Sequence, residues 1–311
     1  MKIIFFGTGN FALATLKKLI ESNHNLLAVV TQPDRKKGRG WKIAPQPIKT
    51  FIQENRPEVP ILQPEKVSDN NFIEDLKKIN TDIFVVVDYG QILGEEVLRI
   101  PKKYCINLHP SLLPKYRGAA PLERAVLAGE KKTGNTIIVM NSRMDAGDII
   151  AQVETTIAER EDIVRLSFRL AAEGADLVIK ALNEIVSGEE KPRAQNEREA
   201  TYAPKLKKEE GNIDWSNSAE EIERKVRGLK SWPGAFTYLD GKMLKIIETE
   251  IAVSANEDHS PGEVYGDKKI FVSTGKGSIL ITKLQLEGKK IMPAEEFLKG
   301  HSIIDGTVLG K

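Results

Sequence analysis

Short apolar runs alternate with amphipathic stretches over the first 190 residues. The apolar runs are rich in Val, Ile and Phe, as expected for strands buried on both faces. They cover residues 2–6, 26–31, 82–87, 104–108 and 136–140. The clearest helical stretch covers residues 162–186, where Ile163, Leu166 and Leu170 recur at intervals of three and four. Strands joined by helical crossovers predict an α/β fold with a Rossmann-like, doubly wound and mostly parallel sheet.

The pattern changes near residue 202, where strand-like alternation replaces helical periodicity. The alternating runs cover residues 236–239, 243–248, 269–273 and 278–284, and turn sequences such as Asp240-Gly241 separate them. They predict a small antiparallel β domain, and an OB-like barrel is one form that such a domain takes. Gly188 and the charged, proline-containing stretch after it are typical of a linker. We therefore expect an α/β domain over residues 1–188, a linker over 189–205 and a barrel over 206–311.

A polar motif follows the predicted strand over residues 104–108. Side chains two apart on a strand share a face, so Asn107 and His109 should face the same cleft. Pro110 and Pro114 then end the strand and stiffen the loop. A carboxamide that donates hydrogen bonds beside an imidazole that moves protons suits acyl transfer. A lone histidine is more often structural, but Asp145 follows about one supersecondary unit later and could orient the imidazole.

Composition narrows the class of protein. The 311 residues are 41% hydrophobic and 29% charged with a net charge of +2, which is ordinary for a globular chain. The single cysteine, Cys105, permits no internal disulfide and fits a reducing cytoplasm. No apolar run approaches the roughly 20 residues of a membrane span, and the four histidines show no metal-ligand spacing. We expect a cytoplasmic enzyme without a metal, and a monomer, because no heptad pattern indicates assembly.

The opening Gly7-Thr8-Gly9-Asn10-Phe11-Ala12 matches the G-x-G-x-x-A pattern of dinucleotide-binding folds. An NAD or FAD enzyme is therefore the main rival hypothesis. The second predicted strand, however, ends in Val30-Thr31-Gln32-Pro33, where a ribose-binding acid would be expected. The glycines then serve a tight turn and close helix packing.

A basic segment, residues 33–45, follows the second predicted strand and is long for such a connection. Its core from Asp34 to Lys42 has five basic side chains, one acid and one aromatic ring that could stack on a base. The basic and aromatic residues are Arg35, Lys36, Lys37, Arg39, Lys42 and Trp41. The residues alone leave two interpretations open, a nucleic-acid contact and a solvated loop.

Several of these stretches together resemble one family over almost the whole chain. They are FFGTGNFAL, TQPDRKKGRG, NLHPSLLPKYRGAAP, MDAGD, TYAPKLKKEEGNIDW and SWPGAFTY. They resemble the folate-dependent formyltransferases, and TYAPKL with KKEEG and IDW is similar to the branch that formylates initiator methionyl-tRNA in translation initiation. A related enzyme that formylates an amino sugar, or one that hydrolyses formyl-folate, is the alternative.

The resemblance implies roles for particular residues. Asn107, His109 and Asp145 would be the catalytic trio, with 10-formyltetrahydrofolate as co-substrate. The loop Ser111, Leu112, Leu113 and Pro114 and the segment Tyr89, Gly90 and Gln91 would bind the folate. The basic segment and the C-terminal barrel would bind tRNA. Asp88 departs from the family, which commonly has a small residue there, and the sequence does not decide whether it faces the sheet or the cleft.

Overall fold

The computed structural model describes residues 1–37, 42–252, 259–266, 268–301 and 303–310. The chain forms two compact units that interleave along the sequence. The first comprises Met1–Gly118, Lys132–Thr156 and Ser167–Ala203, and the second comprises Ala119–Lys131, Ile157–Leu166 and Pro204–Lys311.

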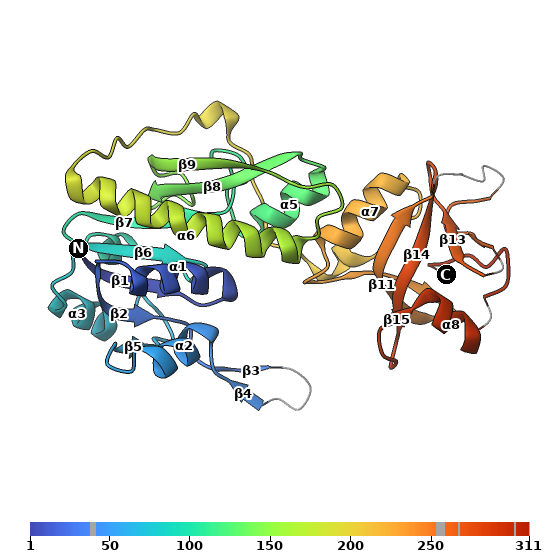
Figure 1. Ribbon diagram of the computed structural model, residues 1–311, viewed down its shortest axis with the longest axis horizontal. Helices are drawn as coiled ribbons and strands as arrows, with labels where there is room; N and C mark the ends of the chain where they lie inside the picture. The colour runs from blue at the N-terminus through green and yellow to red at the C-terminus, as the bar shows by residue number, and fades with distance from the viewer. Residues whose placement is uncertain (38–41, 253–258, 267, 302, 311) are drawn as a thin grey trace. The chain divides into compact units, whose positions relative to one another are not determined.

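The first unit is built on a seven-stranded sheet with the order β5-β2-β1-β6-β7-β8-β9 (Figure 1). The strands are β1 (Lys2–Gly7), β2 (Asn25–Val30), β5 (Ile61–Leu62), β6 (Ile83–Val87), β7 (Tyr104–His109), β8 (Lys132–Val139) and β9 (Ile149–Thr156). The pairs from β5 to β7 are parallel, whereas β8 pairs antiparallel with both β7 and β9. The expected mostly parallel, Rossmann-like sheet is confirmed, and β8 is the strand that runs against the others.

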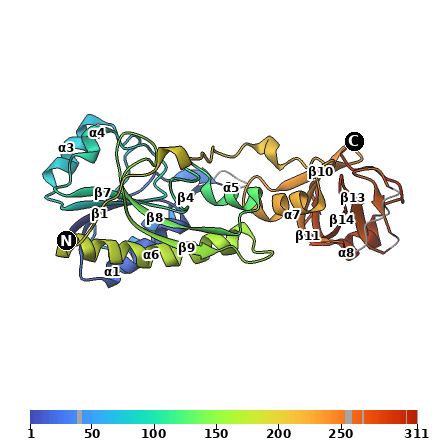
Figure 2. The same ribbon diagram turned by 90° about the horizontal axis from the view of Figure 1, so that it is seen from above.

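Helices cover both faces of this sheet, with α3 and α4 on one side and α1 and α6 on the other (Figure 2). They are α1 (Asn10–Glu21), α2 (Pro47–Asn55), α3 (Asn70–Lys78), α4 (Glu95–Leu98) and α6 (Ile163–Ser187). Strand alternation divides the apolar residues between two cores, so Ile3 and Phe5 pack with α1, α2 and α6, while Ile4 and Phe6 pack with α3 and α4. This two-sided burial explains why the strands are apolar almost throughout.

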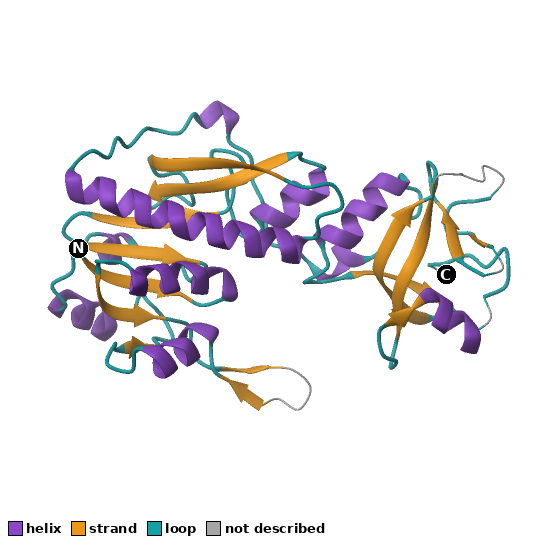
Figure 3. Cartoon of the chain, viewed as in Figure 1, coloured by secondary structure: helices purple, strands orange, loops and turns teal. Residues whose placement is uncertain are grey.

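The second unit holds an antiparallel sheet with the order β10-β11-β14-β13-β12, and β15 pairs with β14. Its strands are β10 (Ala235–Leu239), β11 (Lys242–Ile251), β12 (Val264–Tyr265), β13 (Ile270–Ser273), β14 (Ser278–Leu286) and β15 (Met292–Pro293), and its helices are α5 (Pro121–Ala128), α7 (Ala219–Gly228) and α8 (Ala294–Gly300). Figure 3 shows the strands curling into an open barrel. The expected small β-barrel is confirmed in this form.

Two short segments complete the chain. The basic segment contains a two-stranded antiparallel hairpin, β3 (Arg35–Lys37) and β4 (Lys42–Ala44), rather than a loop throughout. The stretch expected as a linker contains the short helix η1 (Glu197–Glu199), and its residues up to Ala203 belong to the first unit. A second short helix, η2 (Lys208–Gly211), follows in the second unit.

No helix in the described part of the chain is both long enough and apolar enough to cross a membrane.

Candidate active site

His109 is the last residue of β7 and is only 4% exposed. Leu108 packs into the core on the α1 and α6 face, so strand alternation places Asn107 and His109 together on the opposite face. Because β1, β6 and β7 are parallel, His109 shares an edge of the sheet with Gly7 and Val87. The chain leaves β1 for β2 on one side and returns to β6 on the other. This edge is therefore the switch point where α/β sheets bind ligands.

The imidazole of His109 lies between a carbonyl and a carboxylate. Its Nε2 is 2.9 Å from the carbonyl oxygen of Tyr116, and its Nδ1 is 3.7 Å from Oδ2 of Asp145. A carbonyl can only accept, so the proton of the neutral ring is on Nε2 and the lone pair is on Nδ1. The structure thus brings the predicted histidine and aspartate together, and it directs Nδ1 toward the carboxylate.

Asp145 lies in a tight turn after β8. Its backbone has φ of 49°, a left-handed conformation that a residue other than glycine rarely adopts. The same Oδ2 that faces His109 accepts a hydrogen bond of 2.8 Å from the backbone N–H of Gly118. One carboxylate oxygen therefore links the imidazole to the loop that follows Pro114.

Asn107 is half-buried, two residues before His109 on the same strand face. Two residues along a strand correspond to about 7 Å. Within the described part of the chain, its carboxamide makes no hydrogen bond. Its N–H groups are thus available to a ligand beside the imidazole.

The loop expected to bind folate, residues 111–114, is fixed by buried contacts of two of its residues. Ser111 is fully buried and donates to the carbonyl of Lys115, and Leu113 packs against Ile138 and Ile149. The carbonyl of Ser111 in turn accepts from the Thr136 hydroxyl at 2.6 Å. Ser111 and Leu113 therefore fix the shape of the loop.

Two residues of this loop keep exposed surface. Leu112 and Pro114 are half-buried, and the Leu113–Pro114 peptide bond is cis. They are the side chains of this loop that a ligand can reach.

The segment Tyr89 to Gln91 is also held by internal hydrogen bonds. The Tyr89 carbonyl accepts from Thr8 and Gln32, and the Gln91 amide bonds to Val67, Glu65 and Gln32. The space around Gly90 is open, because a Cβ added there would have no atom within 4 Å. The Tyr89 hydroxyl is buried without a hydrogen-bond partner in the described residues, and burial raises its pKa. This segment thus offers a ligand its backbone and the open surface at Gly90.

Asp88 lies against the glycine turn at the start of α1. A Cβ on Gly9 would come within 2.3 Å of Oδ2 of Asp88, so the carboxylate lies on this turn and not inside the sheet. A dinucleotide would place its negatively charged pyrophosphate at this helix N-terminus, where Asp88 would repel it. A Cβ on Gly7 would collide with Phe5 and Ala12, so that glycine serves close packing. The structure thus favours the packing interpretation over the rival dinucleotide site.

The basic hairpin is described only in part. Arg35 pairs with Glu65 at 3.3 Å, and both side chains are exposed. The backbones of Lys36, Lys37 and Lys42 lie in β3 and β4. Arg39 and Trp41 lie outside the described residues.

The sequence did not single out Gln195, which links Arg117 to the turn that holds Asp145. Gln195 donates to the carbonyls of Asp145 and Gly147 and accepts from the guanidinium of Arg117. The motif KYRGAAP marked Arg117, whereas no periodicity singles out Gln195 in its polar segment.

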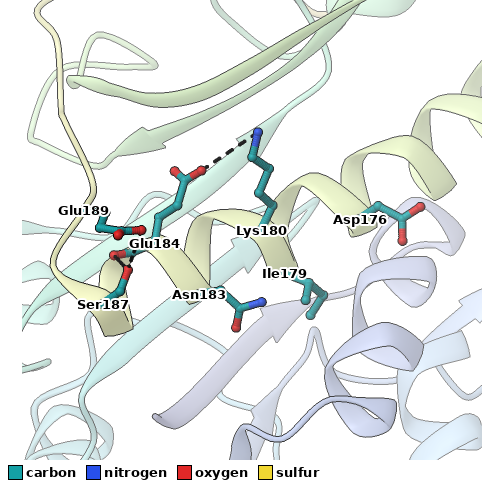
Figure 4. Close-up of a pocket in the computed structure, with 7 residues that line it drawn as sticks. All are labelled: Asp176, Ile179, Lys180, Asn183, Glu184, Ser187 and Glu189. Carbon is teal, nitrogen blue, oxygen red and sulfur yellow. Dashed lines mark hydrogen bonds and ion pairs between the residues drawn. The ribbon is translucent and has the colours of Figure 1, made fainter.

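A surface hollow of about 560 Å³ lies along the C-terminal half of α6 (Figure 4). It is lined by Asp176, Ile179, Lys180, Asn183, Glu184, Ser187 and Glu189. None of the predicted site residues lines it.

Among the described residues, no three His, Cys, Asp or Glu side chains gather as metal ligands would.

Two family descriptions match the chain. "Formyl transferase" matches residues 1–182, and "Formyl transferase, C-terminal domain" matches residues 205–302. The methionyl-tRNA formyltransferase of Geobacter sulfurreducens is 44% identical over 100% of this chain and 97% of its own length. That of Caldanaerobacter subterraneus subsp. tengcongensis is 43% identical over 99% of this chain and 100% of its own length.

Solved structures share the fold. WlaRD, a sugar 3N-formyl transferase solved in the presence of dTDP and 5-N-formyl-THF, has a TM-score of 0.69 at 19% identity, covering 93% of this chain and 99% of its own. HypX from Aquifex aeolicus, in complex with tetrahydrofolic acid, has a TM-score of 0.66 at 20% identity, covering 99% of this chain and 50% of its own. Methionyl-tRNA formyltransferase from Clostridium thermocellum has a TM-score of 0.54 at 19% identity, covering 81% of this chain and 94% of its own.

Proposed function

We propose that this chain, which belongs to the formyl transferase family, transfers a formyl group from 10-formyltetrahydrofolate to the α-amino group of initiator methionyl-tRNA. The observation that carries the proposal is the 44% identity, over 100% of the chain, to a relative named methionyl-tRNA formyltransferase. The pairing of His109 with Asp145 at the ligand-binding edge of the sheet supplies the matching chemistry.

His109 and Asp145 would move the proton that the attacking amine loses. With Nε2 donating to Tyr116, the lone pair of Nδ1 can take up this proton. The carboxylate of Asp145, 3.7 Å away, would stabilise the imidazolium that forms. The imidazolium then gives this proton to the folate nitrogen as the bond between that nitrogen and the formyl carbon breaks.

Asn107 would stabilise the negative charge on the formyl oxygen. Attack by the amine forms the new C–N bond and places this charge on the oxygen, within reach of a free carboxamide N–H. Loss of one such donor typically costs about 10²–10³ in rate. The Nε2–H of His109 is already bonded to the carbonyl of Tyr116, which leaves Asn107 as the principal donor.

We assign the folate to the surface between the two loops at this edge. Leu112 and Pro114 would contact the pterin, and the backbone from Tyr89 to Gln91 would contact its polar edge. Ser111 and Leu113 are buried, so their part is to shape the loop. The open space at Gly90 supports this placement.

We assign tRNA binding to the basic hairpin and to the C-terminal barrel over residues 206–311, with catalysis in residues 1–188. Within the basic segment over residues 33–45, Arg39 is the residue on which we expect binding to depend most. Arg39→Ala should raise the KM for charged tRNA, or lower kcat/KM, with little effect on folate binding, and initial-rate kinetics with each substrate varied would measure this. An equal effect on both substrates would contradict the assignment. We also propose that the protein is a cytoplasmic monomer that uses no metal ion.

A comparison of formyl acceptors tests the function. The purified protein is incubated with 10-formyltetrahydrofolate and initiator methionyl-tRNA, with a nucleotide-linked amino sugar, or with water alone. We expect formyl-methionyl-tRNA as the product. Formylation of the sugar alone would contradict the acceptor and leave the chemistry in place, and release of formate alone would indicate a hydrolase.

A further inference from the structure

We propose that Gln195 is a positioning residue that holds Asp145 at its working distance from His109. The inference rests on the proposed function, since it assigns a role toward the same aspartate. Gln195 lies in the segment between α6 and the second unit, and it need not contact either substrate to act.

Gln195 uses both ends of its side-chain amide. Nε2 donates to the carbonyl of Asp145 at 2.8 Å and to the carbonyl of Gly147 at 2.7 Å. Oε1 accepts from Nε and Nη2 of Arg117 at 3.1 and 2.8 Å. Among the described residues, no other donor to either carbonyl is found. Gln195 is thus the link that fixes the two carbonyls of the aspartate turn.

The turn needs such a link because its backbone is strained and crowded. Asp145 has φ of 49°, a left-handed conformation that costs most L residues roughly 1–2 kcal/mol and aspartate somewhat less. A Cβ on Gly147 would lie 1.6 Å from the carbonyl oxygen of Val139, so the turn packs closely against the end of β8. This close packing and the two hydrogen bonds from Gln195 together restrict the movement of Asp145.

Arg117 anchors Gln195. Its side chain is 2% exposed, and its two terminal nitrogens meet the two carboxylate oxygens of Glu197 at 3.0 and 3.2 Å. Moving this buried guanidinium away from its partners would leave a buried charge unpaired, which is energetically costly. Its position is therefore fixed. Gln195 is therefore attached to a fixed point of the first unit.

The same segment also supports the loop that contacts His109. Thr201 accepts from the N–H of Tyr116, and Tyr116 accepts from His109. The N–H of Arg117 donates to the carbonyl of Thr201, and the N–H of Ala203 donates to the carbonyl of Arg117. Residues 195–203 thus hold both partners of the imidazole, and the hydrogen-bond pairing of Gln195 is the part specific to Asp145.

Two substitutions of Gln195 test the proposal, with Arg198→Ala as a matched control. Gln195→Leu keeps the approximate size of the side chain and removes the donors and the acceptor. Gln195→Glu keeps its shape and places a carboxylate against two carbonyls. Arg198 lies three residues along the segment, is exposed, and makes no side-chain hydrogen bond within the described residues. It therefore reports any general effect of altering this segment.

Both Gln195 variants should lower kcat by about 10- to 100-fold, as expected when a reacting group is misplaced by about 1 Å. The KM values for the folate and for methionyl-tRNA should change by less than about threefold, because neither substrate has lost a contact. Arg198→Ala should match the wild type. Full kcat in either Gln195 variant would overturn the proposal.

A double-mutant cycle with Asp145→Asn separates positioning from a general loss of structure. If Gln195 acts through the charge of Asp145, Gln195→Leu should lower the single-turnover rate by less than about threefold in the Asp145→Asn background. An equal loss in both backgrounds would overturn the proposal. The comparison of formyl acceptors with the wild-type protein tests the proposed function separately. The double-mutant cycle can then be measured with whichever acceptor the wild type formylates, so the two proposals can fail independently.

Discussion

Asp145→Asn tests the charge beside His109 with little change in shape. Asparagine keeps an oxygen that can accept from Gly118, where the aspartate now accepts at 2.8 Å. It removes a negative charge 3.7 Å from Nδ1 of a histidine whose side chain is 5% exposed. At an effective dielectric constant of about 20, the Coulomb energy at this distance is about 4 kcal/mol. Since about 1.4 kcal/mol is a factor of ten, this energy sets an upper limit of roughly 10³ on the loss in rate.

The assay is formylation of initiator methionyl-tRNA at saturating concentrations of both substrates. We expect kcat to fall by about 10²–10³, with the KM for folate within about threefold of the wild-type value. Asp145→Ala also loses the hydrogen bond from Gly118, so its activity should be lower still. Retention of more than about a tenth of wild-type kcat by Asp145→Asn would refute the charge argument.

Two further predictions concern stability. Gly147→Ala should lower the free energy of unfolding by more than about 2 kcal/mol, because its Cβ would overlap the backbone oxygen of Val139. Gly300→Ala should not lower it, because Gly300 is helical and nothing lies within 4 Å of the added Cβ. Equal unfolding midpoints in urea for these two variants would contradict this. The Arg117 guanidinium lowers the pKa of Glu197 below its usual 4.5, so this carboxylate stabilises the fold above about pH 4.5 and the contribution is lost as pH falls through the folded pKa. Glu197→Gln should therefore make the acid-side fall in unfolding free energy shallower, and an unchanged slope would count against the pair.

The central strands could be predicted from the sequence because burial on both faces leaves a short apolar run. The helix α6 could be predicted because its apolar residues recur at intervals of three and four. Residues 82–87 and 104–108 agree with β6 and β7 to within a residue. The edge strand β9 gave no such signal, because half of the residues in its sequence IIAQVETT are polar and only its first residue is fully buried. The hairpin of β3 and β4 was expected as a loop, because a run of basic residues shows no alternation.

The meeting of His109 with Asp145 was a hypothesis from the sequence, and the structure gives it a distance. The motifs could not show which imidazole nitrogen faces the carboxylate, because that depends on the carbonyl of Tyr116 in the turn seven residues later. Gln195 was beyond prediction for a related reason. Its partners include two backbone carbonyls, and every residue has one. The amino-acid sequence therefore does not show which carbonyls a glutamine will contact.

The most direct test of the account is the single-turnover rate at which formyl-methionyl-tRNA appears when excess enzyme is mixed with 10-formyltetrahydrofolate and initiator methionyl-tRNA. We predict rapid product formation by the wild type and a loss of at least about 10² in both Asn107→Ala and His109→Ala. Near wild-type rates in both variants would contradict the assignment of the site.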